Sequence, residues 1–285
     1  MEKESNKGLI SLHLAVLLLG VVGLFAKVVN LPSVIIVLGR VFFSSIFLWC
    51  FLFFRKQKIL LNEKKDYVWM IGAGMVLAVH WTCHMQAIQT STVAIGTLVF
   101  STFPLFVTFM EPYLFHEKLK ISDIICALVM LAGVLFIVPE FELSNSMTQG
   151  VLWGLGSAFT YAILGLLNRR FTTTYQAPVV SFYEQSVACI VLLPTLFVLR
   201  PEITVKDAGM LLIMGVVFTA IAHTLFINSL KTVKVRTAGI VSGLESVYSI
   251  IAALIFLGEV PGVKEIVGGV IIMAAVFYST LKASK

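Results

Sequence analysis

The segment Ala87 to Val138 reads AIQTSTVAIGTLVFSTFPLFVTFMEPYLFHEKLKISDIICALVMLAGVLFIV, and a related segment follows 142 residues further along the chain. The second segment, Ser229 to Thr280, reads SLKTVKVRTAGIVSGLESVYSIIAALIFLGEVPGVKEIVGGVIIMAAVFYST and aligns with the first without a gap. Aligned positions of similar chemistry include Thr90 with Thr232, Glu117 with Glu259, Asp123 with Glu265, and Gly96 and Gly133 with Ala238 and Ala275. This alignment predicts an internal duplication.

The same displacement also relates residues outside these segments. It pairs Lys27 with Arg169 and Ala78 with Ala220. Two apolar segments share some letters through composition alone, so agreement within one window would be weak evidence. Because the register also holds nearer the start of each half, we interpret the pattern as a repeat. A duplicated hydrophobic unit of this size is typical of transporters.

The composition excludes a soluble domain. The chain has 285 residues, of which 59% are hydrophobic and 13% charged, and its mean hydropathy is +0.98. A soluble domain carries charge on about a quarter of its residues. The basic residues behind the net charge of +6 lie mainly in short segments between apolar runs. This is the pattern of a membrane protein and not of a nucleic-acid-binding protein.

The sequence has no signature of a cofactor or metal site. Its four cysteines lie within apolar runs and lack the paired spacing of a zinc site or a disulfide framework. No G-x-x-x-x-G-K-S/T loop occurs, so ATP-driven activity within this chain is unsupported. We therefore expect no cofactor and no metal.

Ten apolar runs are long enough to cross a bilayer as helices, because a hydrocarbon layer of about 30 Å needs roughly 20 residues at about 1.5 Å each. The runs are Leu9 to Ala26, Ser33 to Phe54, Tyr67 to Ile88, Val93 to Phe115, Ile121 to Val138, Gly150 to Asn168, Ala177 to Leu199, Ala208 to Ser229, Val235 to Leu257 and Val263 to Leu281. Five fall in each half. The sequence therefore predicts an all-α membrane protein with ten transmembrane helices.

The distribution of basic residues predicts the orientation of these helices. Sixteen Lys and Arg residues lie in the segments on one side and four on the other, with Arg40 inside a helix. Cytoplasmic loops are enriched in Lys and Arg. We therefore expect both termini in the cytoplasm and the chain in a bacterial cytoplasmic membrane.

An odd number of helices per repeat forces the second unit to enter the membrane in the opposite direction. We therefore predict two inverted five-helix repeats, residues 1–144 and 145–285, related by a pseudo-two-fold axis in the membrane plane. Two similar halves in opposite orientations can exchange conformations and expose one central site to each side in turn. The symmetry favours transport by alternating access.

The fourth and ninth helices carry a family resemblance. The first half reads AIGTLVFSTFPLF from Ala94 to Phe106 and then Leu114-Phe115-His116-Glu117, and the second half echoes it with Leu244-Glu245-Ser246 and Leu257-Gly258-Glu259. This pattern resembles the ten-helix, EamA-type form of the drug/metabolite transporter superfamily, which has a mid-helix proline and a terminal glutamate element in each half. The second half departs from it at Ser246, where the proline would fall.

The resemblance implies an arrangement as well as a function class. Helices one to four and six to nine would surround a central cavity, with helices five and ten at the periphery. Members move amino acids, nucleotide sugars, amines and other small metabolites, so the resemblance leaves the cargo open. It implies a transporter and not an enzyme.

Glu245 lies about ten residues into the ninth helix, close to the expected bilayer midplane. An ionised side chain at that depth costs about 2.5–3.5 kcal/mol on insertion scales, so such residues usually face a cavity or a partner. One interpretation is a cavity carboxylate that binds a substrate amine or takes up a coupling proton. The other is a structural carboxylate paired with a neighbouring helix.

Arg40 in the second helix lies at a depth similar to that of Glu184 and Gln185 in the seventh, measured from opposite faces. About three extra residues before the seventh helix make these positions repeat equivalents. They could form matched polar gates on opposite sides of a cavity. The alternative is that Arg40 snorkels or caps a neighbouring helix end.

The third helix turns several polar groups toward one region. His80 and His84 are four residues apart and share a face, which suits a metal ion, but no nearby carboxylate or second ligand motif completes a site. Trp81 aligns with His223 under the repeat displacement. We expect these four side chains either to line the cavity or to form hydrogen bonds between helices.

Tyrosines and two further glutamates complete the set of candidates. Tyr161, Tyr183 and Tyr248 could line the same space and stack on an organic substrate, or could simply pack between helices. Glu111 and Glu117 lie near the cytoplasmic end of the fourth helix, where a loop or interface role is expected.

These features predict a secondary transporter, an exporter of small organic metabolites that are amino-acid-like or amines. Arg40 and the histidines favour an anion, Glu184 and Glu245 favour a cation, and both together favour a zwitterion. Expected partners are this substrate, the lipid bilayer and, as a candidate coupling ion, the proton. The alternative in the same class is a proton-coupled or facilitative importer.

A second class of function is an intramembrane metal-dependent enzyme built on His80, His84 and a carboxylate. Such a site needs its reacting groups at one depth. The sequence places the histidines outward of Glu245 and Glu184 inward of it, which argues against this alternative. A receptor-like protein would leave the inverted duplication unexplained.

Overall fold

The structure is a computed structural model, and every regular element in the residues that it describes is helical. It describes residues 2–115, 121–138, 142–171, 174–229, 232–233 and 235–282. The elements are α1 (Glu2–Val28), α2 (Ser33–Phe54), α3 (Lys64–Thr90), α4 (Val93–Phe100), α5 (Phe103–Phe115), α6 (Ile121–Ile137), α7 (Ser146–Phe171), α8 (Ala177–Leu199), α9 (Val205–Gly215), the π-helix η1 (Val216–Ile221), α10 (Ala222–Ser229), α11 (Val235–Leu257) and α12 (Val263–Lys282). The predicted all-α class is confirmed.

These elements form ten spans. α4 and α5 together occupy the fourth expected run, and α9, η1 and α10 occupy the eighth. Within the described ranges, seven segments are long and apolar enough to cross a membrane, and Ile124–Ile137 and Val241–Leu257 are shorter apolar helices. The ten-helix prediction is consistent with this arrangement.

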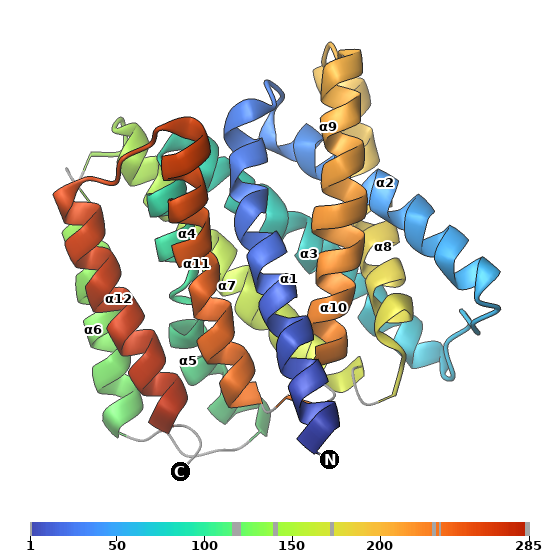
Figure 1. Ribbon diagram of the computed structural model, residues 1–285, viewed down its shortest axis with the longest axis horizontal. Helices are drawn as coiled ribbons and strands as arrows, with labels where there is room; N and C mark the ends of the chain where they lie inside the picture. The colour runs from blue at the N-terminus through green and yellow to red at the C-terminus, as the bar shows by residue number, and fades with distance from the viewer. Residues whose placement is uncertain are drawn as a thin grey trace.

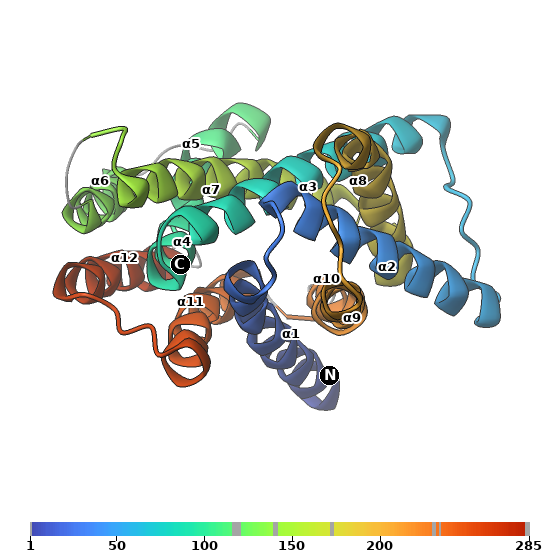
Figure 2. The ribbon, with the colours of Figure 1, turned by 90° about the horizontal axis from the view of Figure 1, so that it is seen from above.

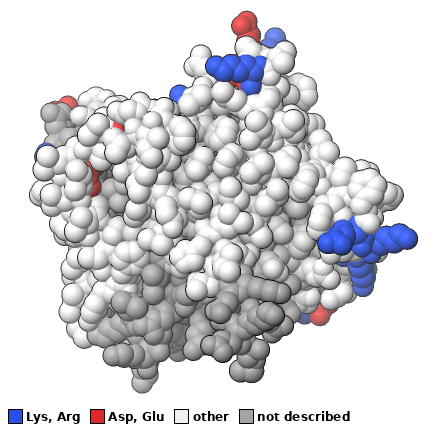
Figure 3. All heavy atoms as spheres, in the orientation of Figure 1, with Lys and Arg blue, Asp and Glu red and all other residues white. Residues whose placement is uncertain are grey.

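The molecular surface is that of a protein embedded in lipid. Large apolar side chains are exposed on many helices, among them Phe54, Ile125, Phe197 and Phe256. Figure 3 shows Lys and Arg gathered at two edges of the visible face, with a broad area of other residues between them. Contiguous exposed apolar surface of this kind is rare on soluble monomers. The chain is a multi-pass membrane protein.

Helix packing in one half has an equivalent in the other half. α3 packs against α7 and α8, and the α9–η1–α10 span packs against α1 and α2. α4 and α5 pack against α7 as α11 packs against α1, while α2 meets α8 and α6 meets α12. Both views place α6 and α12 together at one edge, away from α1, α3 and α10 (Figures 1 and 2). The fold is two inverted five-helix repeats with α6 and α12 at the periphery.

The spans connect two faces of the molecule. α1 begins and α12 ends at the same face, at the bottom of Figure 1, and we call it the terminal face. It includes residues 55–63 and 174–176. The opposite, far face includes residues 29–32, 91–92, 200–204 and 258–262.

Hydrogen bonds at the far face join the turn between α3 and α4 to other helices. They run from Thr92 Oγ1 to Glu265 Oε1 at 2.8 Å, from the Val93 amide to Glu259 Oε1 at 2.6 Å and from Lys27 Nζ to the Ser91 carbonyl at 2.5 Å. The first two connect the repeats. Glu117 lies outside the described residues, as do the side chains of Asp123 and Glu111, so their predicted roles stay predictions.

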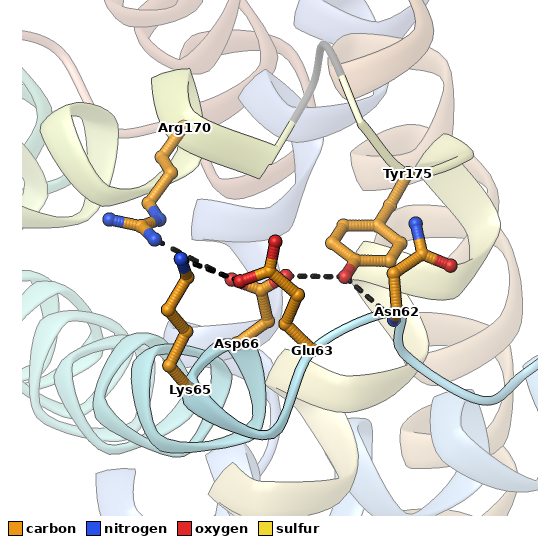
Figure 4. Close-up of polar contacts among 6 residues, drawn as sticks. All are labelled: Asn62, Glu63, Lys65, Asp66, Arg170 and Tyr175. Atoms are coloured by element: carbon orange, nitrogen blue, oxygen red, sulfur yellow. Dashed lines mark hydrogen bonds and ion pairs between the residues drawn. The ribbon is translucent and has the colours of Figure 1, made fainter.

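A polar network at the terminal face connects the loop after α2 with the loop after α7. The Tyr175 hydroxyl donates to Asp66 Oδ2 at 2.5 Å and accepts from the Asn62 amide at 2.9 Å, and Arg170 lies 3.6 Å from Asp66 Oδ1 (Figure 4). Burial and the bond to Asp66 raise the pKa of the Tyr175 hydroxyl. The phenol therefore remains a donor at neutral pH.

The fourth span is broken where its repeat partner is continuous. α4 ends at Phe100 and α5 begins at Phe103, so Pro104 falls in the first turn of a new helix, where its missing amide is tolerated. In α11 the corresponding residue is Ser246, and its hydroxyl donates to the Thr97 carbonyl at 2.8 Å. The departure from the family pattern thus supplies a contact between the repeats.

Candidate substrate-binding cavity

A cavity of about 90 Å³ lies between the two halves. Helices α1, α2, α3, α4, α7, α10 and α11 contribute to its wall. Its polar and aromatic lining residues are Arg40, His80, Trp81, His84, Phe100, Tyr161, Asn168, His223, Phe226 and Glu245. α6 and α12 contribute none of its lining residues, in agreement with their peripheral position.

Arg40 is held in the wall by uncharged partners. Only 1% of its surface is exposed, its Nε donates to Thr219 Oγ1 at 2.9 Å, and its guanidinium lies 4.0 Å from the centroid of the Trp81 ring. A cation over an indole face is stabilised by the ring quadrupole, most strongly when water is excluded. These contacts fix the position of Arg40 without neutralising its charge.

The π-helix η1 provides the hydroxyl that binds Arg40. Thr219 lies in η1 and donates to the Met214 carbonyl at 2.8 Å, which leaves its oxygen free to accept from Arg40. Gly215 permits the close approach, because a Cβ there would lie 2.7 Å from the Arg40 carbonyl oxygen. π-Helical turns within helices often occur at functional sites.

Glu245 of α11 also lines the cavity and remains partly exposed inside it. It lies close enough to Arg40 for electrostatic attraction. The two side chains nevertheless form no direct ion pair within the described part of the chain. A fixed cation and a carboxylate therefore face one space, and both can contact a molecule that occupies it.

Two histidines of α3 join an aromatic cluster on the wall. His80 Nδ1 lies 3.0 Å from the Ser157 carbonyl oxygen, and the His80 ring lies 5.1 Å from Tyr161 and 5.4 Å from Phe100. His84 is buried, and its Nδ1 has no partner among the described residues. Within those residues no group of three His, Cys, Asp or Glu side chains could hold a metal ion.

His223 connects the cavity to a carboxylate behind it. His223 Nε2 lies 2.9 Å from Glu184 Oε2, and its ring meets the Trp81 ring edge-on at 5.6 Å. Glu184 has no exposed surface and does not line the cavity. Its second oxygen, Oε1, has no partner in the described part of the structure.

Comparison with known proteins agrees with this architecture. The model of the EamA-like transporter family matches residues 6–138 and again 148–281, so its second match begins 142 residues after its first. The chain belongs to the EamA-like transporter family. The spacing of the two matches equals the displacement of the repeat.

Relatives of this family member are also described as transporters. An uncharacterized transporter YxxF of Bacillus subtilis is 23% identical over 82% of the chain and 76% of its own length. An uncharacterized transporter of Archaeoglobus fulgidus is 24% identical over 78% of the chain and 77% of its own. A crystal structure 17% identical in sequence covers 98% of both chains with a TM-score of 0.70, which supports the fold. The protein is a membrane transporter and not an enzyme.

Seven of the ten candidate residues of this EamA-like transporter line the cavity. They are Arg40, His80, Trp81, His84, Tyr161, His223 and Glu245. Glu184 lies behind His223, Gln185 accepts a hydrogen bond from Ser44 between α8 and α2, and Tyr248 packs beside Gly20 of α1. Substrate binding by any of them remains a prediction. The histidines and Glu245 line the same cavity, and their expected separation by depth in the membrane stays a prediction.

Asn168 was not selected from the sequence, yet it lines the cavity near the end of α7. It is buried, and its Oδ1 has no partner among the described residues. An asparagine beside two arginines at the end of an apolar run looks like the start of a loop. Only its depth relative to the facing helices would have marked it.

Proposed function

We propose that this transporter carries a small organic molecule with an ammonium group, amino-acid-like or a simple amine, by alternating access through the central cavity. The observation that carries the proposal is the pair of opposite charges, Arg40 and Glu245, which face one enclosed space without neutralising each other. A carboxylate on the substrate would pair with Arg40 and an ammonium with Glu245.

The size and wall of the cavity support a small substrate. About 90 Å³ suits a compact organic molecule better than a bulky one such as a nucleotide sugar. Tyr161, Phe100 and Trp81 provide aromatic faces for its apolar part. His84 Nδ1 and Asn168 Oδ1 are buried polar atoms without partners in the described residues, and a bound molecule would satisfy them.

We propose export as the direction. The cavity lining extends toward the terminal face, since Asn168 and Ile227 lie in the last turns of α7 and α10. The far face is held by the bonds of Glu259 and Glu265 to the turn between α3 and α4. With the terminal face in the cytoplasm, as the distribution of Lys and Arg favours, this arrangement loads substrate from inside the cell.

We propose residues 1–144 and 145–285 as the two units that exchange conformations. Their contacts across α2–α8 and α6–α12 pair each helix with its own repeat partner. Such interfaces can rock about the pseudo-two-fold axis while the site between them stays in place.

Counterflow in proteoliposomes tests the proposal. Vesicles containing the protein and loaded with a mixed pool of unlabelled amino acids, amines and organic anions are given the same pool with label. We expect saturable exchange of ammonium-bearing members and its loss in Glu245→Gln, while Glu202→Gln, at an exposed glutamate of the far face, leaves exchange unchanged.

Two outcomes would contradict the proposal. If only organic anions exchange, the substrate has no ammonium group for Glu245 to bind. Exchange that survives Glu245→Gln at unchanged half-saturation would move the binding site away from α11.

A further inference from the structure

We infer that His223 and Glu184 form the exchangeable proton site of this transporter, distinct from the groups that contact its cargo. The inference rests on the proposed function and assigns its coupling ion. His223 lies in the cavity wall, and its Nε2 is 2.9 Å from a carboxylate that has no exposed surface. A proton can therefore reach Glu184 from the cavity through the imidazole, whereas cargo cannot.

The charges around the cavity leave room for one proton. Among the described residues, Arg40 is the permanent cation of the wall, and Glu245 and Glu184 are the carboxylates on it or directly behind it. With both carboxylates ionised and the imidazoles neutral, the group has a net charge of minus one. A buried net charge is costly, and one proton shared by His223 and Glu184 cancels it.

The unpaired oxygen of Glu184 supports the same assignment. An ionised carboxylate in a dry environment needs partners on both oxygens, yet Oε1 has none in the described structure. Proton transfer between Nε2 of His223 and Oε2 of Glu184 changes neither the hydrogen bond nor the net charge of the pair. The pair therefore holds its proton in either arrangement.

The charged and titratable groups that share the cavity with His223 lie on four helices. They are Arg40 on α2, His80 and His84 on α3, Tyr161 on α7 and Glu245 on α11. α1 contributes Leu19 and Val22 to the wall, and its His13 is exposed on the outside of the molecule. Glu245 faces the cavity directly, so bound cargo contacts its carboxylate. Glu184 is shielded from the cargo and can hold a proton whether or not cargo is bound to Glu245.

This arrangement sets a charge rule for transport. A monovalent amine adds one positive charge to the cavity, so it replaces the proton of the pair, which leaves through the cavity to the side that is open. A zwitterionic amino acid adds no net charge, and the pair keeps its proton. We therefore expect one-for-one exchange of amines with protons and transport of zwitterions without proton movement.

Fluorescence of Trp81 tests the proton site without any cargo. The other tryptophans, Trp49, Trp69 and Trp153, are exposed and are replaced by Phe, which leaves Trp81 edge-on against His223. A protonated imidazole quenches a neighbouring indole more than a neutral one does. We expect a fluorescence titration of the purified full-length protein in nanodiscs that disappears in His223→Asn and has a displaced midpoint in Glu184→Gln.

His13→Asn is the matched control, because His13 is an exposed histidine of the same membrane region, and it should leave the titration unchanged. A titration that persists in His223→Asn would overturn the inference. An unchanged midpoint of the fluorescence titration in Glu184→Gln would also overturn it. Glu184→Gln keeps the shape of the side chain, so it tests the inference even if His223→Asn fails to fold.

Gradient-driven transport tests the charge rule. Proteoliposomes with an acidic lumen receive either a pool of labelled monoamines or a pool of the corresponding neutral amino acids. For one-for-one exchange, each pH unit drives about tenfold accumulation of amine. Because the neutral form of an amine also crosses a bare bilayer and reaches the same limit, the initial rate is measured. We expect faster gradient-driven uptake in the wild type than in protein-free vesicles, loss of this excess rate in Glu184→Gln with counterflow retained, and no effect of the gradient on amino acids.

The outcomes separate this inference from the proposed function. Counterflow without any response to the gradient in the wild type would overturn the proton site and leave the proposed function intact. An excess rate of gradient-driven uptake retained in Glu184→Gln would likewise overturn it. If neither pool moves in the wild type, the proposed function fails, and the Trp81 titration still decides whether the pair exchanges a proton.

Discussion

Arg40 and Glu184 occupy equivalent positions, since Arg40 is as far from the start of α2 as Glu184 is from the start of α8. Their partners are equivalent as well, because Trp81 and His223 are related by the repeat displacement. One half thus holds a guanidinium against an indole, and the other holds a carboxylate against an imidazole. The first pair has a fixed charge, and the second can exchange a proton.

The comparison shows how duplication can divide two tasks between copies of one site. A permanent cation provides a constant anchor for a substrate carboxylate, and its η1 hydroxyl and indole partners keep it in place. A titratable pair at the equivalent position can change charge during a cycle. The backbone symmetry is retained, while the side chains give the two halves different roles.

The largest effect is expected from removal of the fixed charge. Arg40→Ala removes the donor to the Thr219 hydroxyl and the cation that attracts Glu245 across the cavity. A buried charge left without compensation costs about 3–5 kcal/mol. Reversible unfolding in mixed detergent micelles measures this loss. Arg55→Ala, at an exposed arginine, is the control and should change stability by less than about 0.5 kcal/mol. Equal stability of the two variants would show that Arg40 is not anchored as described.

The η1 hydroxyl should contribute less. Thr219→Val removes the acceptor of the Arg40 Nε hydrogen bond while it preserves the shape of the side chain. A hydrogen bond to a charged group contributes about 1.5–3 kcal/mol, so the free energy of unfolding should fall by that amount. Thr219→Ser keeps the hydroxyl and should stay close to the wild type. A serine variant as unstable as the valine variant would assign the effect to packing.

A titratable contact outside the cavity provides a reference for the proton pair. Tyr175→Phe removes the hydroxyl bond to Asp66 and should lower stability by about 1.5 kcal/mol at neutral pH. Because the pKa of Tyr175 is raised in the folded protein, this contribution is complete below about pH 10 and is lost as pH rises through the raised value. Stability measured against pH should therefore fall less steeply above pH 10 in the variant.

This reference variant should leave the Trp81 fluorescence titration unchanged, because Tyr175 lies at the terminal face and does not line the cavity. A displaced titration would mean that the network of Figure 4 and the proton pair act as one unit.

The smallest effect is expected at the indole under Arg40. Trp81→Phe keeps an aromatic face, but phenyl binds a cation less strongly than indole, and we expect a loss of about 0.5–1 kcal/mol in stability. A double-mutant cycle with Arg40→Gln isolates the cation–π interaction from the change in packing. A coupling energy of zero would show that the Arg40–Trp81 contact does not contribute to stability.

Much of the fold could be predicted because the membrane imposes strong constraints on sequence. Run length determines the spans, and an odd number of spans per repeat determines their inversion. The breaks within spans were not predicted. Pro104 lies at the break between α4 and α5, but the sequence alone did not show that the helix ends there. No residue of Val216–Ile221 indicates a π-helix, because this segment reads as ordinary apolar α-helix.

The site was predictable by residue type more than by position. Polar residues within apolar runs pointed to Arg40, Glu245 and the histidines, and the cavity collects them. Depth along a helix could not show that Glu184 lies behind His223, because azimuth around the helix decides which side faces the cavity. Asn168 was missed for a different reason, because its place beside two arginines at the end of an apolar run resembles the start of a loop. Tyr248 packs toward α1 instead of the cavity.

The unequal fourth and ninth spans affect the energetics of the proposed cycle. If the halves exchange conformations, α11 must bend where α4 and α5 are already broken, and it must do so at Ser246 without a proline to remove a backbone donor. The two end states therefore differ in free energy even though the backbone is nearly symmetric. An empty carrier should rest mostly in one orientation, and the return step without cargo should limit the rate of net transport.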